Sequence, residues 1–268
     1  MKINQAETIE EVISELDKII LWSLENKSSL GYFPSLYKQV TARVKEGVEQ
    51  EEFADNHRME RLDVAFANRY LEAFAAYLEN ETLTKSWQLT FDAQRQWWPL
   101  VLQHLLVGMN AHIHLDLGIA AAQTSPGDSV HHLKEDFNAI NALLCLMIDQ
   151  VQEALVFAWK PLKLIDAVAG QLDEGIAGHG IRFSRDFAWG NALRFSGMPY
   201  GASVWGEEIL KLDGKVSKWG NKMIKPGGLF GLTAKCIRIM ENKDVVKCIE
   251  SLNNNKVVLK KQSLSKSE

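Results

Sequence analysis

Residues 97–123 read WWPLVLQHLLVGMNAHIHLDLGIAAAQ, and this stretch decides the fold. It contains no Asp, Glu, Lys or Arg between Trp97 and Leu115. A run of this length also suits a membrane span, but several polar side chains interrupt it, namely Gln103, His104, Asn110, His112 and His114. A helix that is apolar almost all round is typical of the centre of a bundle. We therefore expect a central buried helix here, beginning somewhere between residues 91 and 97.

The segments on either side predict further helices. Apolar residues recur at three- and four-residue spacing over residues 8–24, and Thr8 with Glu11 has the pattern of a capping box. Other helices are expected at residues 35–50, 58–79, 130–157, 182–195 and 204–224. No internal repeat and no alternating strand pattern is visible. The sequence predicts an all-α fold, a single-domain multi-helix bundle over residues 1–252, with a disordered polar tail at 253–268.

The composition is that of an ordinary soluble globular protein. The chain has 268 residues, of which 46% are apolar and 24% charged, and this excludes general disorder. Its 30 Lys and Arg against 34 Asp and Glu give a net charge of −4, so we expect neither a nucleic-acid partner nor a membrane partner. Three cysteines without metal-like pairing and no secretory signal indicate the cytoplasm. A small-molecule substrate is the expected partner, and the oligomeric state stays open.

Two His-x-x-x-Asp pairs are the candidates for chemistry. His112 and Asp116 form the first pair, and His132 and Asp136 form the second. Residues four apart on an α-helix differ by about 40° around the axis and about 6 Å along it, so the side chains of each pair can converge on one atom. An imidazole nitrogen with a carboxylate oxygen is a partial ligand set for zinc, manganese or iron.

The loop between the pairs suggests that they meet. If the helices at 97–123 and 130–157 form an antiparallel hairpin that turns near Pro126, Asp116 lies at the level of Asp136. His112 and His132 then lie about one turn to either side. We expect these four side chains to form a site with room for one divalent metal ion, or for two.

Two further residues have expected roles at this site. Asp63 heads an otherwise apolar stripe of the helix at 58–79, where an unpaired carboxylate is unfavourable, so it is a candidate fifth ligand or general base. His104 lies on the same helical stripe as His112. It is a candidate for a residue that orients a metal-binding side chain without contacting the metal itself.

These residues support two hypotheses about function. The first is a metal-dependent hydrolase of a phosphoester or a related small substrate, in which the metal lowers the pKa of a bound water. The alternative is a non-catalytic ligand-binding or interaction module, in which each Asp accepts a hydrogen bond from a nearby imidazole and the network holds the core together. Whether the protein is an enzyme stays open at this point.

Four motifs carry a resemblance to a known family. They are GYFPSLY (31–37), RMERLDVAFANRY (58–70), MNAHIHLDLG (109–118) and HHLKEDFNAIN (131–141). Together they resemble the bacterial domain-of-unknown-function family 5995, over about residues 16–229. The resemblance implies that most of the chain is one domain, and it implies no activity.

A looser similarity concerns three residues of the first pair. Asn110, His112 and Asp116 are similar to the Asn-x-His-x-x-x-Asp element of the zinc-dependent phospholipase C and single-strand nuclease superfamily. The order of the pairs along the chain differs from that superfamily, and its N-terminal tryptophan ligand is missing. The similarity therefore serves the hydrolase hypothesis as an analogy.

Overall fold

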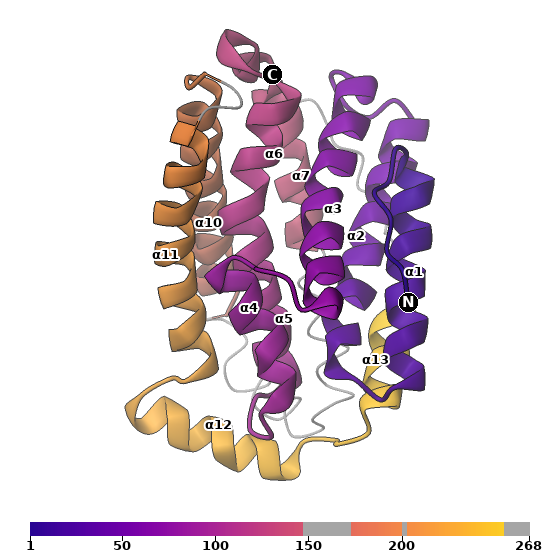
Figure 1. The fold of residues 1–268 in the computed structure, drawn as a ribbon, viewed down its shortest axis with the longest axis vertical. Helices are drawn as coiled ribbons and strands as arrows, with labels where there is room; N and C mark the ends of the chain where they lie inside the picture. Colours follow the sequence, from indigo (N-terminus) through magenta and orange to yellow (C-terminus); the bar gives the residue numbers. More distant parts are fainter. Residues whose placement is uncertain (147–172, 200–202, 255–268) are drawn as a thin grey trace.

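The protein is helical throughout the part that its computed structural model describes, residues 1–146, 173–199 and 203–254 (Figure 1). No strand occurs within these ranges, which confirms the all-α prediction. The α-helices are α1 (Ile9–Glu25), α2 (Tyr32–Glu49), α3 (Asn56–Glu79), α4 (Lys85–Asp92), α5 (Val101–Ala111), α6 (Leu117–Thr124), α7 (Lys134–Leu146), α10 (Asp173–Ser196), α11 (Ser203–Ile224), α12 (Gly228–Met240) and α13 (Val245–Asn254). The predicted polar tail lies outside the described residues, except for positions 253 and 254, which end α13.

The long helices run side by side along the long axis of the molecule, and α12 crosses one end of the bundle (Figure 1). On one side of the central helices, α1 packs against α2 and α3. On the other side, α10 packs against α6, and α11 packs against α4 and α5. The central helices are therefore enclosed from both sides.

The centre of the bundle is one continuous rod, in which a π-helical turn, η3 (His112–Asp116), joins α5 to α6. The rod spans Val101–Thr124, its most apolar window has a mean hydropathy of 1.3, and it is long and apolar enough to cross a membrane. However, 83% of its most apolar window is buried inside the bundle. The expected central buried helix is confirmed. It begins at Val101, later than expected, and residues 85–92 form the separate helix α4.

The helix that follows the central rod begins later than the sequence suggested. Residues 127–133 form a 3-10 segment, η4 (Gly127–Leu133), and α7 starts only at Lys134. The main neighbours of α6 are α3 and α10, whereas those of α7 are α2 and α10. The expected hairpin, with α6 and α7 facing each other, is therefore not how these two helices pack.

Gly118 marks a close approach between α6 and α10. A Cβ atom at this position would lie 2.7 Å from the Cβ of Asn191 and 2.8 Å from the backbone oxygen of Ala188. Backbone of a packed helix cannot move aside easily, so Gly118→Ala is expected to lower the free energy of unfolding by about 1–3 kcal/mol. Urea denaturation measures this change.

Gly190 provides the matched control, because it is exposed on α10 and a Cβ atom there would have no described neighbour within 4 Å. Gly190→Ala is expected to stabilise the protein by about 0.5–1 kcal/mol, since alanine restricts the unfolded chain and favours a helix. Equal effects of the two substitutions would contradict the close packing of α6 on α10.

Candidate functional site

The two halves of the first His-x-x-x-Asp pair lie at the two ends of η3, in the interior of the bundle. A π-helical turn adds one residue to the helical ladder, and such turns are frequent at functional sites. This turn contacts α3, α10 and α11. The chain therefore places His112 and Asp116 where several helices meet.

The Asp116 carboxylate accepts hydrogen bonds from two other helices. The Arg69 Nε of α3 donates to Oδ1 at 2.9 Å, and the Trp87 Nε1 of α4 donates to Oδ2 at 2.9 Å. The His112 Nδ1 lies 3.4 Å from Oδ2. Burial alone would raise the pKa of this carboxyl, but Arg69 and the hydrogen bonds outweigh burial and hold the pKa below its usual value. Asp116 is thus a buried, ionised acceptor that joins α3, α4 and the central rod.

The His112 imidazole is enclosed by aromatic rings. It stacks on Phe66 with ring centroids 3.6 Å apart, and Tyr37 meets it edge-on at 4.6 Å. Burial lowers the pKa of His112 despite the neighbouring carboxylate, so the ring is neutral at pH 7. With Nδ1 next to Asp116, the other ring nitrogen, Nε2, is an acceptor, and it has no hydrogen-bond partner among the described residues.

Asp63 is a buried carboxyl of α3 that makes no ion pair with any described residue. Its Oδ2 makes no hydrogen bond within the described part of the chain. Burial, with a smaller contribution from Glu60, raises the pKa of Asp63 to about 7. Burial raises the pKa of the nearby Tyr37 hydroxyl, and the Asp63 carboxyl raises it further. Asp63 therefore spends part of its time protonated at neutral pH.

The second His-x-x-x-Asp pair does not lie next to the first pair in the structure. Asp136 is fully buried, but it accepts from the Ala54 backbone N–H at 2.7 Å and from the Arg58 Nη2 at 2.6 Å. Arg58 and Arg69 lie eleven residues apart on α3, which is about 16 Å along the helix axis. The two carboxylates are therefore held at different levels of the bundle.

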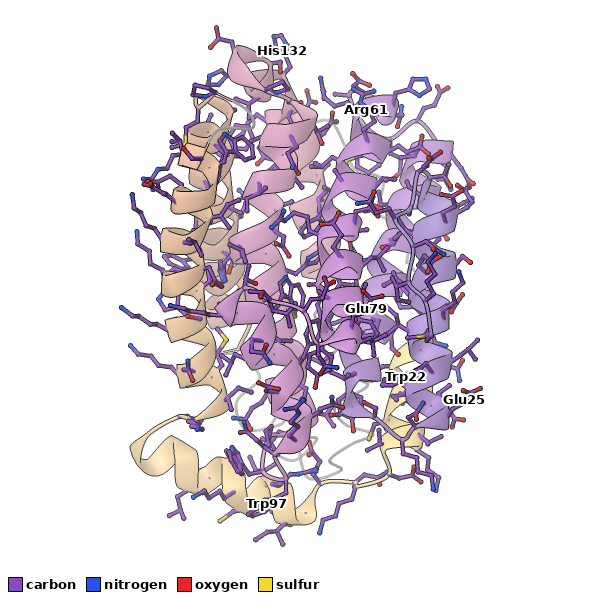
Figure 2. All side chains as sticks on the ribbon, viewed as in Figure 1. Trp22, Glu25, Arg61, Glu79, Trp97 and His132 are labelled. Atoms are coloured by element: carbon purple, nitrogen blue, oxygen red, sulfur yellow. The ribbon has the colours of Figure 1, made fainter. Side chains whose placement is uncertain are left out.

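His132 lies outside the helix that carries Asp136. It is exposed in η4, at the end of the molecule opposite Trp97 (Figure 2). The expected convergence of His112, Asp116, His132 and Asp136 therefore does not occur, because α7 begins after His132 and because each acid has an arginine partner. No group of three His, Cys, Asp or Glu side chains within the described ranges is arranged to hold a metal ion. Binding of zinc, manganese or iron stays a prediction.

His104 lies far from the first pair along the rod, at the edge of a polar pocket of about 340 Å³. Tyr32 meets its ring edge-on with centroids 5.7 Å apart. Burial, followed by the charge of Arg238, lowers the pKa of His104 to about 4, so its imidazole is neutral. Among the residues that line this pocket are Lys27, Gln96, His104 and Arg238.

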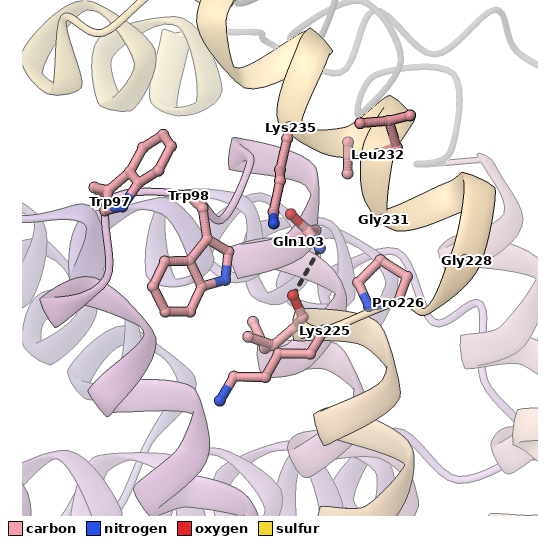
Figure 3. Close-up of a pocket in the computed structure, with 11 residues that line it drawn as sticks. Trp97, Trp98, Gln103, Lys225, Pro226, Gly228, Gly231, Leu232 and Lys235 are labelled. Atoms are coloured by element: carbon pink, nitrogen blue, oxygen red, sulfur yellow. Dashed lines mark hydrogen bonds between the residues drawn. The ribbon is translucent and has the colours of Figure 1, made fainter.

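A second pocket, of about 660 Å³, adjoins the same end of the bundle (Figure 3). Trp97, Trp98, Lys225 and Lys235 are among its lining residues, and Trp97 also lines the polar pocket. The Lys225 Nζ lies 5.9 Å from the centre of the Trp98 ring. Both pockets therefore lie between the ends of the bundle helices and the segment that contains α12.

Comparison with known proteins places the chain in one family. A model described as a family of unknown function (DUF5995) matches residues 9–226. The chain belongs to this family. No curated protein and no solved structure matches it.

The DUF5995 match confirms the resemblance that the four sequence motifs carry, and it contains all six predicted site residues. The polar pocket, however, is completed from outside the matched region, because Arg238 and Val245 line it as well. The sequence pointed to His104 but not to its pocket, since Arg238 is 134 positions away. Arg58 and Arg69 were missed too, although their spacing of three turns on one face of α3 was visible.

Proposed function

We propose that this DUF5995 protein is a non-catalytic ligand-binding module. The pocket beside His104 takes a small anionic molecule, and the His/Asp network holds the core together. The sequence supports this hypothesis as the alternative to a hydrolase, and we now propose a particular cavity as the binding site.

An unpartnered polar group at the pocket carries the proposal. The Oε1 atom of Gln96 is buried and accepts no hydrogen bond from the described residues. The half-buried His104 imidazole lines the same pocket and is kept neutral by burial. A buried polar group without a partner is unfavourable, so groups of this kind indicate a place where a ligand supplies the missing hydrogen bonds.

The charges at the pocket select the class of ligand. Arg238 and Lys27 line it, and no Asp or Glu of the described residues does. Arg238 is fixed in place, because its Nε donates to the Trp97 backbone oxygen at 2.8 Å and its Nη1 donates to Glu241 at 2.7 Å. A fixed guanidinium is suited to a carboxylate or phosphate group. The volume of about 340 Å³ is that of a small-molecule site.

The hydrolase hypothesis has weaker support from the same side chains. Asp116 and Asp136 each accept two or more hydrogen bonds, one of them from an arginine. A carboxylate held in this way stabilises the fold. It would have to lose its arginine partner before it could bind a metal ion. His112 and Asp116 alone are two ligands, fewer than the three protein ligands of a typical catalytic zinc site.

Thermal unfolding in the presence of glycerol phosphate, inorganic phosphate and glycerol tests the proposal. At a concentration one hundred times the Kd, an anionic ligand is expected to stabilise the native protein by about 2.7 kcal/mol, which raises Tm by about 5–10 °C. Glycerol, which lacks the charge, is expected to have no effect. Gln96→Leu and Arg238→Gln are expected to abolish the shift.

Arg95→Gln is the matched control, because Arg95 is exposed and lies outside the pocket, next to Gln96 in the chain. It should keep the full shift. An anion-induced shift that survives in both pocket variants, or no shift with either phosphate, would contradict the proposal. Zinc, manganese or iron should leave Tm unchanged, and a rise that His112→Ala removes would favour the hydrolase hypothesis instead.

A further inference from the structure

Helix α12 presents an exposed apolar stripe at the end of the molecule. Leu232 is 61% exposed, Ile239 is 69% exposed and Met240 is 58% exposed. Leu232 and Ile239 are seven residues apart, so they lie within about 20° of each other on the helix surface. Helix α12 crosses the end of the bundle instead of running with the other helices (Figure 1). The three side chains are exposed there, and Leu232 also borders the second pocket.

A tryptophan lies beside the same end. Trp97 is 67% exposed and is placed next to α12 at the foot of the bundle (Figure 2). Contiguous apolar side chains on a surface, including a tryptophan, are unusual for a protein that has no partner there. Tryptophan is also the residue type that prefers the boundary between water and lipid.

The charge of this segment is opposite to that of the whole protein. Residues 222–243 contain five Lys or Arg and one Glu, a net charge of +4, whereas the chain carries −4. The single acid, Glu241, is buried and pairs with Arg238, so it does not offset the surface charge. Four exposed lysines lie on this helix or close to its ends in the chain, namely Lys222, Lys225, Lys235 and Lys243. Lys225 and Lys235 also line the second pocket.

We propose that α12 and Trp97 form a docking surface for a bilayer that contains anionic lipids. A helix with apolar side chains on its outer face and lysines around them is suited to lie in the plane of a membrane, with the stripe at the acyl boundary and the lysines at the headgroups. The expectation of no membrane partner rested on the charge of the whole chain, and the local charge reverses it. Trp97 also lines the proposed ligand pocket, but this inference does not depend on a ligand being bound there.

The charge distribution favours a bilayer over a protein partner of the same kind. Two copies that met through this face would bring two segments of +4 together, which is unfavourable. Lysine is also depleted in the cores of protein–protein interfaces. An anionic lipid surface complements both the lysines and the apolar side chains at once.

Flotation of the full chain with lipid vesicles tests the proposal. The protein is expected to float with vesicles of phosphatidylcholine and phosphatidylglycerol. When the vesicles contain phosphatidylcholine alone, it is expected to remain at the bottom of the gradient. Leu232→Glu/Ile239→Glu is expected to weaken binding at least tenfold, since it places charges at the acyl boundary. Lys235→Glu/Lys243→Glu is expected to weaken it to a similar extent, and added salt should weaken binding by the unmodified chain.

Leu210→Glu is the matched control, because Leu210 is 67% exposed on α11, away from this surface. It should bind vesicles as the unmodified chain does, and unchanged circular dichroism should show that every variant is folded. Vesicle binding that is the same in all variants, or none with anionic vesicles, would overturn the proposal. A dimer in light scattering that the Leu232→Glu/Ile239→Glu variant dissociates, without vesicle binding, would assign the surface to a second copy.

Discussion

Asp116→Asn is expected to lower the free energy of unfolding by about 3–5 kcal/mol, because it removes the negative charge from a buried ion pair while leaving the arginine in place. The amide keeps the shape of the side chain. It cannot, however, accept from both the Arg69 Nε and the Trp87 Nε1, which the two carboxylate oxygens now do. One of these donors is then left facing the N–H₂ group of the amide. Urea denaturation at neutral pH measures the loss.

The same substitution at an exposed ion pair is the control. Asp17 accepts from Lys38, and both side chains are partly in solvent. Asp17→Asn is therefore expected to change stability by less than about 1 kcal/mol. If Asp116→Asn were as mild as Asp17→Asn, the buried carboxylate would not be the junction of α3, α4 and the central rod that its contacts indicate.

Asp63→Asn is expected to have the opposite effect and to stabilise the protein above about pH 7, by roughly 2–4 kcal/mol. The pKa of Asp63 in the folded protein is about 7, against 3.8 for an ordinary Asp carboxyl. As the pH rises from about 4 to about 7, the unfolded chain releases this proton while the native protein retains it. The native protein therefore loses stability across this window, and the loss is complete above it. An asparagine has no proton to release.

The measurement is urea denaturation at about pH 5 and about pH 8, compared between Asp63→Asn and the unmodified chain. The gain should be small at the lower pH and larger at the higher pH. Asp17→Asn again serves as the control at an exposed ion pair, where the substitution should change stability by less than about 1 kcal/mol. A gain that is equal at both values would mean that the Asp63 carboxyl titrates normally in the folded protein.

The fold was predictable because its signals are local and repeated. The uncharged run between Trp97 and Leu115 predicts a buried helix from composition alone. At the start of α1, the Thr8 Oγ1 accepts from the Glu11 N–H at 3.2 Å, as the capping pattern indicates. Each of these predictions depends on residues within a few turns of one another, which periodicity describes well.

The candidate site was less predictable because its partners are distant in the chain. Asp116 meets Arg69 and Trp87, which come from two other helices, and no spacing rule connects them. The His132–Asp136 pair depended on one helix boundary, and the chain forms a 3-10 segment up to Leu133 instead. A boundary shift of a few residues is within the ordinary error of helix limits, but here it separates a histidine from its predicted partner.

The π-helical turn was also beyond the sequence pattern. His112 and Asp116 are four residues apart, which reads as an ordinary helical pair. Nothing in HIHLD marks the extra residue that widens the turn. The turn becomes visible only in the structure, where η3 lies against α3, α10 and α11.

The two arginines of α3 restrict how sequences of this fold can diverge in length. Arg58 and Arg69 reach Asp136 and Asp116 from the same side of one helix, three turns apart. A single residue inserted between them would rotate one guanidinium away by about 100°, and a buried carboxylate would lose its counter-charge. Homologues that gain or lose residues should therefore do so in the connection between α3 and α4 or after Gln96, while the interval from Arg58 to Arg69 keeps its length.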